Sequence, residues 1–191
     1  MNLGQLVKTL GWICVLAGIA RIGMTPTAII WGTDSVQELT FGLIACILMS
    51  VGTIVTYMVQ SEETGGIGLI ATLGIIIGNI VTTAMVWTVF VFGGHVEMPD
   101  GPVVTISRVV SMAGFLGGTL VFAYLTFRAR VFPRWVAGLQ LAIVLSMFLP
   151  LEDNQWFAAV WGLAYVGMGY CIVADRLNKK TAGVHAEGLK M

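Results

Sequence analysis

Long apolar runs alternate with short polar segments along the whole chain. Each run holds about 20 mostly apolar residues, the length that an α-helix needs to cross the core of a membrane. The polar segments carry the proline, glycine and charged residues that end or cap helices. The pattern predicts an all-α, polytopic six-helix transmembrane bundle, with helices at about 3–24, 36–60, 66–92, 105–127, 132–150 and 154–176. We expect residues 1–176 to form a single transmembrane domain and 177–191 a polar cytoplasmic tail.

Local signals set the ends of the first two predicted helices. Pro26 cannot continue the backbone hydrogen-bond ladder, so we expect the first helix to stop there. Residues 27–34 are too few to cross a membrane and predict an interfacial segment anchored by Trp31. Ser35 and Glu38 have the spacing of a capping box and predict the start of the second helix.

The composition supports a lipid environment. The chain is 57% hydrophobic and only 10% charged, whereas soluble domains have about 25% charged residues. Its net charge is zero, and no basic cluster is interleaved with exposed aromatic residues, so we expect no nucleic acid partner. The sequence therefore predicts a multi-pass protein of the cell (plasma) membrane that contacts lipids.

The basic residues predict the orientation of the bundle. With six crossings and a cytoplasmic N-terminus, the C-terminus is cytoplasmic as well, and eight of the ten Lys and Arg residues fall on that side. These eight are Lys8, Arg128, Arg130, Arg134, Arg176, Lys179, Lys180 and Lys190, against Arg21 and Arg108 outside. This asymmetry follows the positive-inside rule. We interpret Arg128, Arg130 and Arg134 as topology anchors, with Phe132 and Trp135 at the membrane boundary; a docking loop is the alternative.

Arg21 is the candidate ligand-binding residue with a charge. We expect it about one turn from the outer end of the first helix, where an ionisable side chain is a functional hypothesis by default. It could form an anion or carboxylate site at the outer mouth of the bundle. Alternatively, it extends to the head groups or pairs with Asp34 or Glu38, which requires no function.

Two polar stripes supply the remaining candidate binding residues. On the second helix, the stripe is Cys46, Ser50, Thr53 and Tyr57; on the third helix, it is Thr72, Asn79, Thr83 and Trp87. Facing stripes could line a path for a small neutral solute. More often such residues form hydrogen bonds between helices and hold the bundle together. Small residues at Gly74, Gly78, Gly114, Gly118, Ala158 and Gly162 also predict close helix packing.

Reactive groups are scarce. The chain has two histidines, no lysine in the middle of a predicted helix, and no serine hydrolase, zinc protease or P-loop motif, so we predict that it is not an enzyme. His95, Glu97 and Asp100 share one loop, but their spacing matches no standard metal site, and we predict no metal. Trp161, Tyr165 and Met168 predict either a core stripe or a face for a pigment, quinone or lipid tail.

The last third of the chain carries a resemblance. RARVFPRWVAGLQLAIVLSMFLP followed by WGLAYVGMGY resembles a pattern of small uncharacterised bacterial multispanning proteins, which implies an inner-membrane location but no activity, cofactor or site. The length and six-helix plan also look like the substrate-binding subunits of energy-coupling-factor transporters, although their alanine-rich coupling motif is not evident at residues 17–21. Urea and amide channels have a similar size, but no motif carries that match.

Three functions remain open at this point. The first is a non-enzymatic accessory or assembly subunit that packs within a larger membrane complex or a homo-oligomer. The second is a small-solute transporter, substrate-binding subunit or channel that uses the polar stripes. The third is a pigment- or quinone-binding membrane subunit; otherwise we predict no cofactor.

Overall fold

The protein is an antiparallel bundle of apolar helices. A computed structural model describes residues 2–92, 101–147 and 155–178, and these residues contain helices but no strands. The helices are α1 (Leu3–Trp31), α2 (Val36–Met58), α3 (Ser61–Phe92), α4 (Pro102–Met112), a π-helical turn η1 (Ala113–Gly117), α5 (Gly118–Ala129), α6 (Arg134–Met147) and α7 (Gln155–Val173). Helices α4, η1 and α5 run on without a break. Five helical segments are long and apolar enough to cross a membrane, and α6 is a shorter apolar helix.

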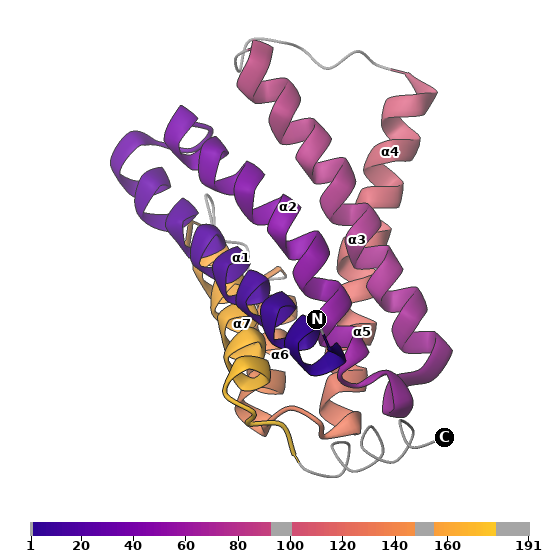
Figure 1. Ribbon diagram of the computed structural model, residues 1–191. Coiled ribbons are helices and arrows are strands. Elements are labelled where there is room, and N and C mark those ends of the chain that lie inside the picture. Colours follow the sequence, from indigo (N-terminus) through magenta and orange to yellow (C-terminus); the bar gives the residue numbers. More distant parts are fainter. Residues whose placement is uncertain (1, 93–100, 148–154, 179–191) are drawn as a thin grey trace.

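Both ends of the described helical chain lie at the same end of the bundle (Figure 1). Early α1 packs on late α7, where Gly11 lies against Ile172. Gln60, after α2, donates a hydrogen bond of 3.1 Å to the hydroxyl of Thr126 in α5. The backbone N–H of Asn178, after α7, donates to the carbonyl of Val131 at 2.9 Å. These contacts bring the start of α1, the α2–α3 and α5–α6 connections and the end of α7 together.

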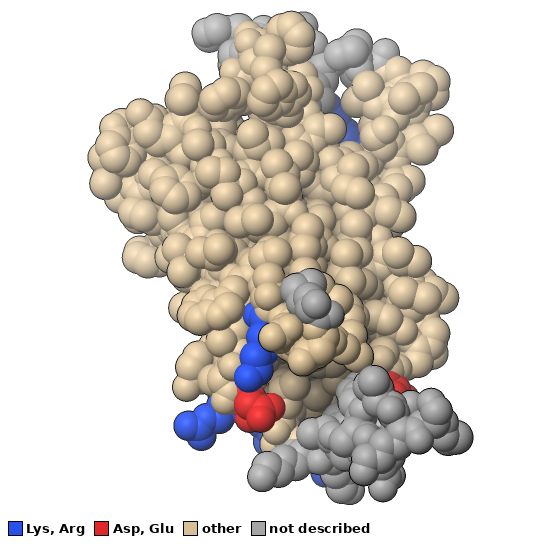
Figure 2. All heavy atoms as spheres, viewed as in Figure 1, with Lys and Arg blue, Asp and Glu red and all other residues tan. Residues whose placement is uncertain are grey.

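We call this end the basic end, because five described basic residues lie there: Lys8, Arg128, Arg130, Arg134 and Arg176. In Figure 2 the charged side chains gather mainly at the lower end of the visible face, and a broad uncharged belt covers the surface above them. Such a belt can face lipid without the cost of removing charges from water.

The first helix is longer than the sequence predicted. It continues through Pro26 to Trp31, so the prediction of a stop at Pro26 and of an interfacial segment at 27–34 was wrong. The hydroxyl of Thr27 donates to the carbonyls of Gly23 (2.8 Å) and Met24 (2.9 Å), in the turn that the proline disturbs. Membrane helices tolerate proline when hydroxyl side chains bond backbone groups in this way.

The predicted cap of α2 is present in part. The side chain of Ser35 accepts a hydrogen bond of 3.3 Å from the backbone N–H of Glu38. The Glu38 carboxylate, however, accepts from the N–H of Asp34 at 2.7 Å, instead of that of Ser35. Helix α3 begins at Ser61, before the predicted start near residue 66, and only Gly65 leaves the helical conformation, at φ 54°. The positive φ favours glycine at this kink.

Glycines bring α1 and α7 into close contact. A Cβ atom added to Gly162 would lie 2.5 Å from the carbonyl oxygen of Gly18, and one added to Gly169 would lie 2.7 Å from that of Gly11. Gly11 and Gly18 are seven residues apart on α1, and Gly162 and Gly169 are seven residues apart on α7. Since seven residues make almost two turns, the two glycines of each helix lie on one face. On the other side of the bundle, the predicted close packing at Gly74 and Gly114 is confirmed, since a Cβ on Gly114 would meet the Gly74 carbonyl at 2.6 Å.

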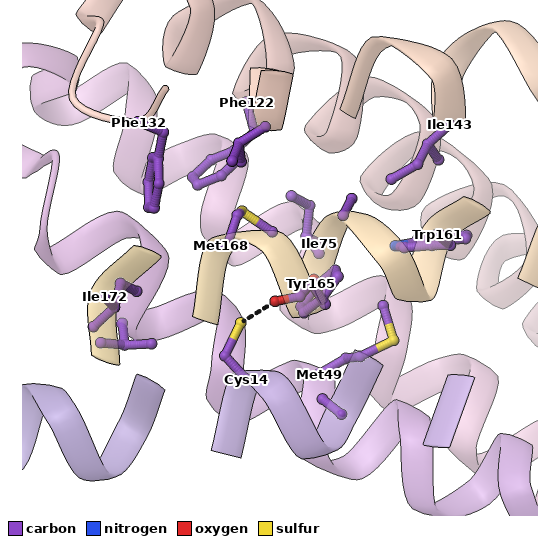
Figure 3. Packing of buried hydrophobic residues seen from close by; sticks show 14 of the residues in the cluster. Cys14, Met49, Ile75, Phe122, Phe132, Ile143, Trp161, Tyr165, Met168 and Ile172 are labelled. Carbon is purple, nitrogen blue, oxygen red and sulfur yellow. Dashed lines mark hydrogen bonds between the residues drawn. The ribbon is translucent and has the colours of Figure 1, made fainter. Parts of the chain in front are cut away.

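The core lies where α1, α2, α3, α5, α6 and α7 converge (Figure 3). Trp161, Tyr165 and Met168 of α7 are all buried in it, which confirms the core stripe predicted for this helix. Phe132 is 1% exposed and belongs to the same core, so its ring packs against protein. Trp135, in contrast, is half exposed.

Candidate functional site: a column of buried polar groups

Polar side chains recur at seven-residue intervals on the inner faces of three helices. Seven residues make almost two helical turns, so residues with this spacing share a face. The buried residues at this spacing are Cys46 and Thr53 on α2 with Gln60 just after it, Thr72 and Asn79 on α3, and Thr119 and Thr126 on α5. We call this set, together with Gln140 of α6 and Tyr165 of α7, the polar column.

A small cavity lies in the middle of the polar column. The volume open to the centre of a water-sized sphere is about 20 Å³, which is room for about one or two water molecules. Five helices line the cavity, and no charged side chain is among its lining residues. They are Thr53, Thr56, Ile75, Thr119, Phe122, Gln140, Ile143, Trp161, Tyr165 and Met168.

The polar groups of the cavity are only partly paired. The hydroxyls of Thr53 and Tyr165 lie 2.7 Å apart and share a hydrogen bond. The amide nitrogen of Gln140 donates to the sulfur of Met168 at 3.0 Å. The amide oxygen of Gln140 and the hydroxyl of Thr119 are buried and have no hydrogen-bond partner within the described chain. The cavity therefore offers an acceptor and a hydroxyl to an occupant.

Of the binding residues predicted on α2, only one lines the cavity. Thr53 lines the cavity, as a residue of a solute path would. Ser50 is partly buried, and its hydroxyl donates to the carbonyl of Cys46 in its own helix at 2.9 Å. The hydroxyl of Tyr57 donates towards the carbonyl of Gly65 at the α3 kink, 3.4 Å away. Ser50 and Tyr57 are not among the residues that line the cavity.

The residues predicted on α3 also divide into two groups. Asn79 is completely buried, and neither atom of its amide has a partner among the residues described. The hydroxyl of Thr83 donates to the Asn79 carbonyl at 2.7 Å and lies close enough to Cys46 to form a hydrogen bond with it. Trp87 is 54% exposed and stacks on Phe90, so it lies outside the polar column.

Arg21 lies deeper than predicted. Since α1 runs on to Trp31, Arg21 is ten residues, or about 15 Å, from the end of the helix instead of one turn. Its guanidinium lies over the ring of Trp161, with 5.1 Å between the guanidinium carbon and the ring centroid. Trp161 also lines the cavity, whereas Arg21 is not among the lining residues. Phe115 and Phe157 pack against the same indole, at 4.2 and 5.1 Å between centroids.

The three predicted topology anchors lie at the basic end. Arg128 lies in the last turn of α5, Arg130 adopts a left-handed backbone conformation just after this helix, and Arg134 is the first residue of α6. All three are exposed. The side chain of Asn178 donates to the Arg130 carbonyl at 2.6 Å and fixes this connection to the segment after α7.

Sequence reasoning missed several residues of the site. Thr56, Thr119 and Gln140 line the cavity but were not among the predicted binding residues, and Tyr165 was predicted only as part of a core stripe or cofactor face. Their signal was the presence of a polar group inside an uncharged apolar run, and for Thr119 also the seven-residue spacing to Thr126. Met168, the sulfur partner of Gln140, has no polar signature, so that contact could not be predicted from the sequence.

Metal ligands do not converge in the described part of the chain. No group of three His, Cys, Asp or Glu residues there could hold a metal ion. The loop with His95, Glu97 and Asp100 lies outside the described residues.

The fold therefore defines a helical bundle with five segments long and apolar enough to cross a membrane, built around a polar column. No protein-family model, curated protein or solved structure matches this chain.

Proposed function

We propose that the chain is a multi-pass protein of the cell (plasma) membrane, with the basic end in the cytoplasm. Two features support this. Five segments have the length and apolar character of membrane spans. Of the described basic residues, Lys8, Arg128, Arg130, Arg134 and Arg176 belong to the basic end, against Arg21 and Arg108 elsewhere, and the positive-inside rule assigns the richer end to the cytoplasm. Lys179, Lys180 and Lys190 lie outside the described residues.

We further propose that the protein is a non-enzymatic carrier or channel for a small neutral polar solute. The observation that carries this proposal is the central cavity, where Gln140 and Thr119 each keep a buried polar atom without a partner among the described residues. A buried polar atom without a hydrogen bond costs about 1–3 kcal/mol. A solute that bonds both atoms recovers this free energy, which gives it a binding site inside an otherwise apolar bundle.

The lining of the cavity favours neutral and small occupants. An ion that enters loses its hydration shell, and no opposite charge lines the cavity to replace it. A neutral molecule loses only hydrogen bonds with water, which the hydroxyl and amide groups can replace. The volume of about 20 Å³ suits a solute of a few atoms better than a pigment or quinone ring.

Transport in proteoliposomes tests this proposal. Light scattering in a stopped-flow instrument measures the entry of water, urea and glycerol into vesicles with and without the protein. We expect protein-dependent entry of at least one of these solutes and a clear loss of that entry in Gln140→Leu. Thr40→Val is the matched control, because Thr40 is exposed and its hydroxyl bonds only its own helix. Equal fluxes with and without protein would contradict the proposal.

An accessory subunit of a larger membrane complex is the second candidate. The observation that favours it is α4, of which no residue is buried. Val103, Ile106, Val109 and Met112 of this helix each expose more than half of their surface. In a complex, another membrane subunit or a second copy would cover these side chains, whereas lipid covers them in a lone protein.

Native mass spectrometry with an absorption spectrum distinguishes these candidates. The protein is extracted in mild detergent from its natural membrane. Co-purifying subunits in fixed stoichiometry would support the accessory role. A lone chain that carries one small-molecule mass would support the carrier, and an absorbing cofactor would indicate the pigment or quinone subunit instead.

A further inference from the structure

Arg21 is a charged side chain inside the bundle without an ion pair in the described part of the chain. One terminal nitrogen, Nη1, donates to the sulfur of Met24 at 3.1 Å. The Nε atom is buried and has no hydrogen-bond partner. The residue as a whole is only partly buried, so some of its atoms are exposed although Nε is covered. An ionisable group at this depth is expensive unless something compensates its charge.

The pattern of used and unused donors on Arg21 is specific. A carboxylate or phosphate that approaches a guanidinium from the side takes the N–H groups of Nε and Nη2 together. Here Nη1 is bonded, whereas Nε and Nη2 form no hydrogen bond within the described residues. The free edge of Arg21 is therefore the edge that binds an oxyanion through two parallel hydrogen bonds.

Contacts around Arg21 hold this edge in place. The guanidinium lies over Trp161, which is 2% exposed and is itself held by Phe115 and Phe157. A cation fixed over an aromatic ring loses less conformational freedom when it binds a ligand. The aromatic rings also exclude water, which strengthens a charge-assisted hydrogen bond.

Glu38 is the nearby carboxylate, and it does not occupy this edge. It is close enough to attract the guanidinium electrostatically, but no ion pair joins the two in the described chain. One of its oxygens instead accepts from the backbone N–H of Asp34 at 2.7 Å. The charge of Arg21 is thus only partly balanced by the protein.

We propose that Arg21 is the centre of an oxyanion-binding site between α1, α2 and α7, which takes a carboxylate or phosphate group through Nε and Nη2. The oxyanion belongs either to a dissolved solute or to the head group of an anionic lipid. This site is separate from the central cavity and goes beyond the proposed transport of a neutral solute. Arg21 is not among the residues that line the cavity, so the loss of one function does not imply the loss of the other.

NMR of the Arg21 side chain tests the proposal directly. The protein is labelled with ¹⁵N-arginine and placed in phosphatidylcholine nanodiscs, and Arg21→Lys identifies the Nε–H signal of Arg21. Sodium acetate, inorganic phosphate and neutral acetamide are titrated in turn, and a second set of nanodiscs contains phosphatidylglycerol. Arg134→Gln is the control, since Arg134 is exposed at the opposite, basic end.

A saturable shift of the Arg21 signal with acetate or phosphate, and none with acetamide, is the expected result and identifies a dissolved oxyanion. A shift that needs phosphatidylglycerol supports the site with lipid as its source. In a binding assay, Arg21→Lys should weaken oxyanion binding about tenfold or more, because it keeps the charge but loses the paired donors. Glu38→Gln should strengthen binding, since it removes a like charge. The proposal is overturned if no oxyanion or anionic lipid produces a saturable shift in any of the wild-type arginine Nε–H signals, a result that needs no variant for its assignment.

Discussion

The contact between α1 and α7 and the exposed helix α4 are built from similarly apolar sequence, but the first is tightly packed and the second buries no residue. Four glycines, Gly11, Gly18, Gly162 and Gly169, let α1 and α7 approach until their backbones touch. Helix α4 contacts mainly α3 and η1 and buries none of its residues. Hydropathy is therefore no guide to packing in this protein. The position of small residues is the better guide, because lipid is as apolar as a leucine side chain.

The largest effect is expected at the contact between α1 and α7. In Gly162→Leu the new side chain would overlap the carbonyl of Gly18 and force the two helices apart. We expect a loss of about 3 kcal/mol or more in the free energy of unfolding, measured by titration with SDS from mixed micelles. Gly138→Leu is the matched control, because an added Cβ at Gly138 meets no atom within 4 Å. Equal losses in both variants would remove the distinction between packed and open faces.

The next effect concerns the connection between α5 and α6. Phe132→Ala removes a ring that is 1% exposed and should cost about 3–5 kcal/mol through the cavity left behind. Phe127→Ala removes the same ring from a side chain that is 54% exposed, and we expect a change within about 0.5 kcal/mol. The same unfolding assay compares the two. A small effect at Phe132 would show that its ring does not pack in the core and would support its predicted place at the membrane boundary.

A gain in stability is expected at Thr72. Its hydroxyl is buried and has no partner in the described chain, so Thr72→Val removes an unpaired polar group at nearly constant volume. The free energy of unfolding should rise by about 1 kcal/mol. If this variant is instead destabilised, the hydroxyl has a bonding partner in the membrane, and the polar column is better paired than the structure indicates.

A smaller effect of the opposite sign is expected at Thr53. Thr53→Val breaks the 2.7 Å hydrogen bond with Tyr165. Hydrogen bonds between membrane helices average about 0.6 kcal/mol, so we expect a loss of this size. Tyr165→Phe and the double variant complete a mutant cycle, and a coupling energy near zero would show that this bond does not stabilise the fold.

The smallest effect is expected on α4. Ile106→Ala shortens a side chain that is 61% exposed, and we expect a change in stability within about 0.5 kcal/mol in detergent. The same variant separates the two candidate functions. In an accessory subunit it should weaken co-purification with partners from the natural membrane, whereas in a lone carrier it should leave the native mass spectrum unchanged.

The sequence by itself determined the number of helices and most of their ends. Apolar length, the Ser35 cap and the turn residues are local properties, and they act through a few neighbouring residues in the structure as they do in the sequence. The wrong prediction at Pro26 also has a local cause: in helices that cross membranes, a hydroxyl such as that of Thr27 can take over backbone hydrogen bonding.

Only the tertiary structure decided which of these helical faces meet. The depth of Arg21, the burial of Phe132 and the convergence of Gln140 with Thr119 all depend on contacts between distant segments. In a soluble protein, the contrast between polar surface and apolar core marks such faces in advance. Here the outward faces of the helices are apolar as well, and the inner faces carry only scattered polar groups, so the sequence pattern lacks the contrast that would tell the two faces apart.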